Sequence, residues 1–224
     1  MNHRFDTEPI PSAVRRLVFD FDGVLALSKP HAWEAAEGIL AALGENRPIR
    51  SREDYRRHWN EAVRGSLVPP GRTGDLREFH RLAMCRRADR MTPHVDLLNL
   101  VNRLRCPAAI VTAGYARTVA RCLRGRITGF RFVRGREEGP KKDLLHRLLK
   151  AGFDDFLYLG DTVRDVRTCA GLGIPVCATA WEHAFNAPDE LAAAGPDHLV
   201  HNIEELESLL DHLNLLKTPN LILK

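Results

Sequence analysis

The chain has few cysteines, and none of them belongs to a Cys-x-x-Cys pair. The five cysteines are odd in number and widely separated: Cys85, Cys106, Cys122, Cys169 and Cys177. Such spacing indicates neither a disulfide framework nor a zinc site built from cysteines. We therefore expect reduced thiols that are buried in the core.

Long apolar runs are also missing. No segment approaches the roughly 18 apolar residues of a membrane-spanning helix. The first residues, Met1 to Arg4, lead into acidic residues and proline instead of the apolar core of a signal peptide. We expect a cytoplasmic protein that does not enter the membrane. An apolar content of 44% and a charged content of 28% are typical of a globular protein.

Charge of one sign is not in large excess. The chain has 33 Lys and Arg against 29 Asp and Glu, which gives a net charge of +4. This mild bias does not indicate nucleic-acid binding. Many of the arginines lie between residues 47 and 90. An anionic substrate near that region would fit this bias. Arg64, Arg72 and nearby arginines are typical of a solvated face, and the alternative is that one of them closes over a substrate anion.

Apolar stretches typical of buried strands alternate with amphipathic stretches typical of helices. The predicted strands are 14–21, 108–112, 130–133, 156–159 and 175–179. The predicted helices between and after them are 93–105, 116–123, 141–150, 163–170 and 203–213. This alternation predicts an α/β fold with a doubly wound, Rossmann-like parallel sheet that has helices on both faces.

A stretch rich in helical spacing interrupts this alternation after the first strand. Its predicted helices are 31–43, 52–63 and 75–90, separated by glycine and proline. The sequence therefore predicts a core domain with a small inserted α-helical cap domain. The predicted division is core 14–26 and 93–214, cap 27–92, lead-in 1–13 and tail 215–224. The apolar tail is expected to pack on the core or on a partner.

Pairs of aspartates follow two of the predicted strands. Asp20 and Asp22 end the first strand, and Asp161 and Asp165 follow strand 156–159. In open parallel sheets, functional residues collect at the carboxyl ends of the strands. Alternation along an extended strand puts Asp20 and Asp22 on one side, where they repel unless a cation lies between them. A magnesium ion between the carboxylates would offset that repulsion. Its predicted oxygen ligands come from Asp20, Asp22, Asp161 and Asp165.

A hydroxyl and a lysine are predicted at the same edge of the sheet. Thr112 ends the second strand, and Lys141 or Lys142 begins the helix before the fourth. A positive charge and a hydroxyl donor suit a bound phosphoryl group, together with backbone N–H groups at Ala113 and Gly114. The set Thr112, Ala113, Gly114 and Lys141 is therefore a predicted phosphate site.

An aspartate beside magnesium and a held phosphoryl group is placed for covalent catalysis. We expect Asp20 to attack phosphorus and form an aspartyl-phosphate. Asp22 then serves as general acid to the leaving alcohol and as general base to the water of the second step.

These motifs resemble those of the haloacid dehalogenase superfamily, in the helical-cap group with phosphoglycolate-phosphatase-like and β-phosphoglucomutase-like members. The motifs in chain order are Asp20-Phe21-Asp22-Gly23-Val24, Val111-Thr112-Ala113-Gly114, the lysine at 141 or 142, and Gly160-Asp161-Thr162-Val163-Arg164-Asp165. The resemblance implies that Asp20 is the nucleophile and Asp22 the acid/base. It also implies magnesium ligands at Asp20, the backbone carbonyl of Asp22 and Asp161, with Asp165 in direct or indirect contact.

The third motif departs from the family's Lys-Pro-x-Pro form, because Gly139-Pro140-Lys141-Lys142 stands there. Both lysines stay candidates, and the spacing to the next leucines favours Lys141. Other functions on the same scaffold stay open, namely a phosphomutase or a non-catalytic binding member. The sequence favours a phosphatase that acts on a small, anionic phosphomonoester, as a monomer or a homodimer.

Overall fold

A single six-stranded sheet forms the centre of the protein in the computed structural model, which describes residues 14–59, 61–66, 73–126 and 129–217. All neighbouring strands are parallel, in the order β3-β2-β1-β4-β5-β6. The strands are β1 (Arg16–Phe19), β2 (Ala108–Val111), β3 (Phe130–Arg134), β4 (Phe156–Gly160), β5 (Val176–Thr179) and β6 (His198–Val200). The order reverses between β1 and β4, which is where open sheets of this kind bind ligands. The predicted α/β fold is confirmed.

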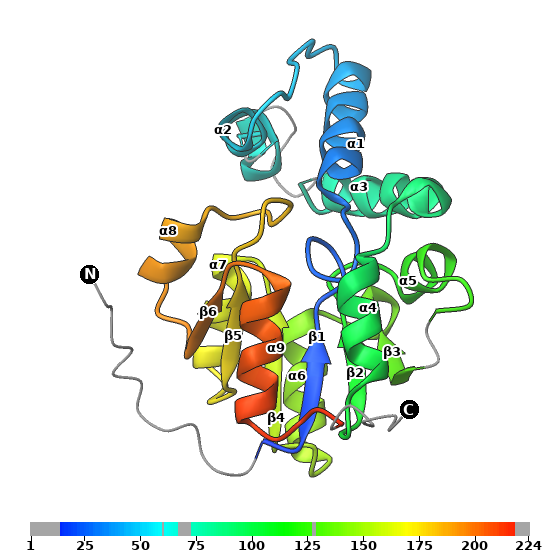
Figure 1. Cartoon of the computed structure of the whole chain (residues 1–224). Helices are drawn as coiled ribbons and strands as arrows, with labels where there is room; N and C mark the ends of the chain where they lie inside the picture. Colours follow the sequence, from blue (N-terminus) through cyan, green and yellow to red (C-terminus); the bar gives the residue numbers. More distant parts are fainter. Residues whose placement is uncertain (1–13, 60, 67–72, 127–128, 218–224) are drawn as a thin grey trace, which may run out of the picture.

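Helices cover both faces of this sheet (Figure 1). Those of the core are α4 (Val95–Asn102), α5 (Ala116–Cys122), α6 (Lys141–Lys150), α7 (Val163–Ala170), α8 (Pro188–Ala193) and α9 (Ile203–His212). Successive strand residues face opposite sides. Leu17 and Phe19 of β1 accordingly share a hydrophobic cluster with α4, α5 and α9, whereas Val18 shares one with α6, α7 and α8.

The chain between β1 and β2 forms the predicted helical insert, which lies beyond the carboxyl ends of the strands (Figure 1). Its elements are α1 (Lys29–Ala42), α2 (Arg52–Asp54), the π-helical turns η1 (Tyr55–Trp59) and η2 (Ala62–Ser66), α3 (Thr73–Arg87) and the 3₁₀ turn η3 (Ala88–Arg90). The two connections to the core run side by side, since Leu27 N–H donates to Thr92 O at 2.9 Å. His94 N–H donates to Leu25 O at 2.8 Å. The insert also has its own apolar cluster, which includes Leu40 and Trp59.

Two predicted elements differ from the structure. The predicted helix 52–63 is a short α-helical turn followed by π-helical winding, because apolar spacing marks a helical face without fixing the hydrogen-bond register. The predicted strand 14–21 is confined to Arg16–Phe19. Beyond it the chain turns, so Asp20 and Asp22 do not alternate along one strand.

The first residues of the predicted tail pack on the core. Leu215 and Leu216 are buried, and Leu215 O accepts a 2.8 Å hydrogen bond from Arg105 N–H. The lead-in 1–13 and the rest of the tail lie outside the described residues. All five cysteines are free thiols, and four of them are buried. No helix in the described ranges is long and apolar enough to cross a membrane.

Candidate active site

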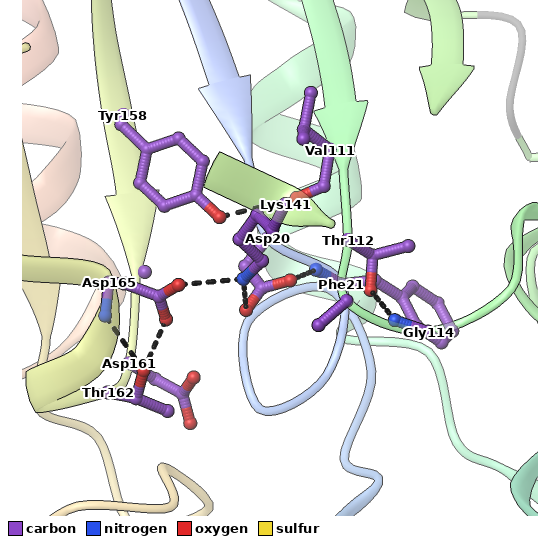
Figure 2. Close-up of polar contacts among 12 residues, drawn as sticks. Asp20, Phe21, Val111, Thr112, Gly114, Lys141, Tyr158, Asp161, Thr162 and Asp165 are labelled. Atoms are coloured by element: carbon purple, nitrogen blue, oxygen red, sulfur yellow. Dashed lines mark hydrogen bonds and ion pairs between the residues drawn. The ribbon is translucent and has the colours of Figure 1, made fainter. Parts of the chain in front are cut away.

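The predicted aspartates, threonine and lysine meet at the carboxyl ends of three neighbouring strands (Figure 2). Asp20 directly follows β1, Thr112 follows β2, and Asp161 follows β4. Lys141 is the first residue of α6. These positions result from the parallel sheet, which brings strand ends that are far apart in sequence to one edge. They line a cavity of about 350 Å³ together with residues of the helical insert.

The carboxylate of Asp20 is held by contacts on both oxygens. Its Oδ1 accepts a 2.7 Å hydrogen bond from Phe21 N–H, and its Oδ2 lies 2.6 Å from Lys141 Nζ. The backbone N–H of Asp20 donates to Leu159 O of β4 at 2.8 Å. Asp20 is 5% exposed, so its orientation is fixed and little of it contacts solvent.

A tight turn after Asp20 turns the chain away from the sheet. Phe21 O accepts hydrogen bonds from the N–H groups of Val24, Leu25 and Ala26 at 2.9–3.3 Å. Gly23 has φ +73°, and a Cβ placed there would lie 2.0 Å from Asp161 Oδ2. Glycine is therefore required twice at this position, by its conformation and by the approach of a carboxylate.

Lys141 links two of the predicted carboxylates. Its Nζ lies 2.6 Å from Asp20 Oδ2 and 2.7 Å from Asp165 Oδ1. Burial alone would lower the pKa of Lys141, but the charges of Asp165 and Asp20 outweigh this and raise it. Lys142 also lines the cavity but is exposed and makes no such contact with the described residues. The geometry thus favours Lys141 of the two candidates.

Asp161 is held by the loop after β5, and Asp165 is held by a residue near it in sequence. Asp161 Oδ2 accepts the N–H of Phe185 at 2.6 Å, whereas its Oδ1 is buried and has no hydrogen-bond partner among the described residues. Asp165 Oδ2 accepts the hydroxyl of Thr162 at 2.6 Å, and Thr162 caps α7 through the Asp165 N–H. The Thr162 N-cap orders the start of α7, and its hydroxyl holds the Asp165 carboxylate, which contacts Lys141.

The carboxylates of Asp20, Asp161 and Asp165 suit a hard divalent cation. One oxygen of each lies within 4.8 Å of the others. Ligand oxygens around an octahedral magnesium ion lie about 3–4 Å apart, so small side-chain adjustments suffice. The unpartnered Oδ1 of Asp161 provides a free ligand atom. The Asp22 carboxylate is not in this group, although Asp22 lines the same cavity.

The electrostatics of the site also call for positive charge. Burial raises the pKa of Asp20 to about 7, although the charge of Lys141 opposes the shift. Burial raises the pKa of Asp161 well above its usual value, and the charges of Asp20 and Asp165 add to this. Burial also raises the pKa of Asp22. Three buried carboxylates and the half-buried Asp22 lie near one lysine, so a divalent cation would favour their ionised forms.

The predicted phosphate site lies beside these carboxylates. Thr112 is 1% exposed, and its Oγ1 accepts the Gly114 N–H at 3.0 Å. A Cβ at Gly114 would lie 3.3 Å from Asp22 Oδ2, so glycine permits close packing here. The Gly114 N–H is thus already engaged, whereas the Ala113 N–H donates to no acceptor among the described residues.

The family and structural comparisons agree with this geometry. Residues 14–173 match the family model of haloacid dehalogenase-like hydrolases. The chain belongs to this hydrolase family. No curated protein matches the sequence.

Solved structures of other proteins share the fold of this haloacid dehalogenase-like hydrolase. A haloacid dehalogenase-like family hydrolase from Streptococcus pneumoniae has a TM-score of 0.74 at 18% identity, over 89% of this chain and 100% of that one. A predicted phosphatase from Clostridium acetobutylicum has a TM-score of 0.72 at 14% identity, over 89% and 99%. A hydrolase of the family from Deinococcus radiodurans, with bound phosphate and sodium, has a TM-score of 0.63 at 16% identity, over 92% and 99%.

Several cavity residues of this hydrolase were not predicted as site residues. Tyr55, Trp59 and His80 of the insert line the cavity, and so does Phe185 after β5. The arginines there are Arg77, Arg81 and Arg164, whereas Arg64 is not among the lining residues and Arg72 lies outside the described residues. A helical face at 77, 80, 81 and 84 was the available signal, but spacing alone does not separate a cavity face from a packing face.

Proposed function

We propose that this hydrolase is a magnesium-dependent phosphatase that cleaves a small phosphomonoester through an aspartyl-phosphate on Asp20. The observation that carries the proposal is the buried cluster of Asp20, Asp161 and Asp165, in which Lys141 bridges Asp20 and Asp165. Such a cluster is costly unless a cation and an anionic ligand use it. The bound phosphate in the related structure from Deinococcus radiodurans supports a phosphoryl ligand.

Magnesium would be held by Asp20, Asp161 and Asp165, with the backbone carbonyl of Asp22 as a further ligand by family resemblance. When bound, the ion polarises the phosphoryl oxygens and offsets the charge that develops on them. Lys141 adds a fixed positive charge beside the nucleophile. The Thr112 hydroxyl keeps its proton for donation, because its oxygen already accepts from Gly114, and the Ala113 N–H is a second donor.

The reaction has two steps on this chain's side chains. In the first, a carboxylate oxygen of Asp20 bonds to phosphorus, the bond from phosphorus to the leaving oxygen breaks, and Asp22 donates a proton to that oxygen. In the second, Asp22 takes a proton from water, which attacks phosphorus and releases inorganic phosphate and Asp20. Burial raises the pKa of Asp22, as an acid that must hold a proton requires.

We also propose that residues 27–92 act as a cap domain over this site. Arg81 of α3 donates from its Nε to Ala113 O at 3.1 Å, and Lys29 Nζ lies 2.6 Å from Glu182 O. These contacts hold the insert against loops of the core on both sides of the cavity. A closed insert keeps bulk water from the phosphoryl group until the alcohol has left.

The test is release of inorganic phosphate from a panel of phosphomonoesters with magnesium. Asp20→Asn should lose at least about 10³-fold in kcat, because it removes the nucleophile, and a chelator should abolish the wild-type activity. Asp143→Asn, an exposed aspartate in the first turn of α6, is the matched control and should retain activity. A wild-type protein that releases no phosphate from any ester would contradict the proposal.

A further inference from the structure

The part of the cavity lined by the helical insert has an aromatic surface. Its rings are those of Tyr55, Trp59, His80 and, from the loop after β5, Phe185. The Trp59 and His80 ring centroids lie 5.0 Å apart, and those of Tyr55 and Phe185 lie 6.3 Å apart. The Tyr55 and His80 ring centroids lie 6.5 Å apart. We call these four connected rings the ring wall.

The His80 ring is held in a fixed, neutral state. Its Nε2 lies 3.0 Å from Ala32 O, and burial lowers the pKa of His80 to about 4. The ring therefore contributes an apolar face and not a positive charge near neutral pH. Trp59 is 6% exposed, so most of its surface packs inside the insert and only part of it reaches the cavity.

One face of α3 adds positive charge next to the ring wall. Its cavity-lining residues lie three or four positions apart, at Arg77, His80, Arg81 and Met84. Arg81 is already engaged, since it contacts Ala113 O at 3.1 Å and Glu78 at 3.2 Å. Arg77 makes no hydrogen bond or ion pair with any described residue. Its guanidinium is thus free to bind a ligand.

An aromatic surface can bind either a cation or another ring, and the arginines decide between them. Burial and the charges of Arg136 and Arg77 lower the pKa of Arg81, whereas its pairing with Glu78 raises it. Arg77, Arg81 and Arg136 thus lie near one another in this corner, and Glu78 is the carboxylate paired with Arg81. The cavity's carboxylates are Asp20, Asp22, Asp161 and Asp165, all at the proposed metal and phosphate site. A cationic leaving group would therefore meet repulsion at the ring wall.

We propose that the substrate's leaving alcohol carries a planar ring, which packs on the ring wall, and a carboxylate, which pairs with Arg77. This inference rests on the proposed phosphatase function and adds the substrate class to it. The cavity of about 350 Å³ is at the lower end of ligand pockets, which span about 300–1,000 Å³, and therefore suits a single ring.

Four synthetic esters of primary alcohols separate the two features. They are propyl phosphate, 4-phosphooxybutanoate, benzyl phosphate and 4-carboxybenzyl phosphate. Their leaving alcohols have similar acidity, so differences in kcat/KM report recognition instead of intrinsic reactivity. We expect the ring to raise kcat/KM about tenfold or more, and the carboxylate to add about tenfold on the benzyl scaffold.

Variants assign each feature to its residue. Tyr55→Leu should remove most of the benzyl preference, and Arg77→Gln should remove the carboxylate preference, so that 4-carboxybenzyl phosphate is no longer cleaved better than benzyl phosphate. The matched controls are Phe79→Ala and Arg86→Gln on the same helix, both exposed and outside the cavity lining. Neither control should change the order of the four esters.

Two failures are distinguishable. If wild-type protein cleaves the ring-free esters as well as the benzyl esters, the substrate class is wrong and the phosphatase function stands. If no ester is cleaved, the phosphatase function fails, and calorimetry of the four esters with the magnesium-loaded protein tests the ring wall alone. Tighter binding of 4-carboxybenzyl phosphate that depends on Tyr55 and Arg77 supports the subsite, and equal binding of all four overturns it.

Discussion

Gly23 is the position where a single methyl group tests the geometry of the proposed metal site. In Gly23→Ala, the new Cβ would lie 2.0 Å from Asp161 Oδ2, an approach that real side chains do not make. Either the turn after β1 or the Asp161 carboxylate must move. Because Asp161 offers an unpartnered oxygen as a ligand, we expect the substitution to weaken magnesium binding as well as folding.

The destabilisation has two parts. An alanine at φ +73° costs about 1–2 kcal/mol, because its Cβ approaches the following carbonyl. Overpacking against a buried carboxylate adds about 1–3 kcal/mol. We expect the free energy of unfolding to fall by about 2–5 kcal/mol in Gly23→Ala, as measured by urea denaturation in the absence of magnesium.

Gly152→Ala is the matched control, since Gly152 also has φ +73° but an added Cβ there would have no atom of the described residues within 4 Å. It should lose only the conformational part, about 1–2 kcal/mol. Magnesium at 100 times its Kd should stabilise wild-type protein and Gly152→Ala by about 2.7 kcal/mol. Gly23→Ala should gain much less. If Gly23→Ala gains the full magnesium increment, Asp161 does not hold the ion as proposed.

Three further predictions concern other residues of the site. Lys141→Met should lower the kcat of phosphate release by at least about 10²-fold, because it removes the positive charge beside Asp20. Lys142→Met should keep kcat within about threefold of the wild-type value, and equal losses in the two variants would contradict the choice of Lys141. Thr112→Val should lower kcat/KM about tenfold, since it removes one hydroxyl donor while keeping the shape, and an unchanged kcat/KM would exclude a phosphate contact. His80 has a pKa of about 4 in the folded protein and about 6.5 when unfolded, so the unfolded state binds more protons between these values and stability falls as pH decreases through this window. Urea denaturation at pH 7 and pH 5 should show a loss of up to about 2 kcal/mol that His80→Gln removes, and an equal loss in the variant would assign it to other groups.

The positions of Asp20, Thr112, Asp161 and Lys141 could be predicted because each one directly follows a strand or begins a helix. Asp20, Thr112 and Asp161 come after apolar runs that only a buried strand explains, and parallel strands necessarily place their carboxyl ends at one edge. The choice between Lys141 and Lys142 was open in the sequence. The choice depends on the direction in which the side chains of the first turn of α6 point. In the structure, Lys141 points toward Asp20.

The predicted reason for pairing Asp20 with Asp22 was wrong, although both residues line the cavity. Strand alternation does not apply, because β1 ends at Phe19 and the turn at Gly23 sets the position of Asp22. A glycine at position 23 is consistent with the positive φ found there. A glycine after two aspartates does not, however, show which carboxylate lies close to it in the fold. That information lies in the contact with Asp161, far along the chain.

The loop after β5 shows most clearly why the rest of the site could not be predicted. No helix or strand was predicted for residues 180–202, yet the structure has α8 and β6 there, and residues 181–185 contact the turn after β1, Asp161 and the insert. Trp181 Nε1 donates to Gly23 O at 3.1 Å, and Phe185 N–H donates to Asp161 Oδ2. Its backbone carbonyls also accept from the insert, since Arg52 lies 3.0 Å from Ala184 O. Because carbonyls and N–H groups occur at every residue, such contacts leave no residue-specific pattern in a sequence. One loop thus contacts the insert, the turn after β1 and the proposed metal ligand, so the position of Asp161 depends on contacts with three separate parts of the chain.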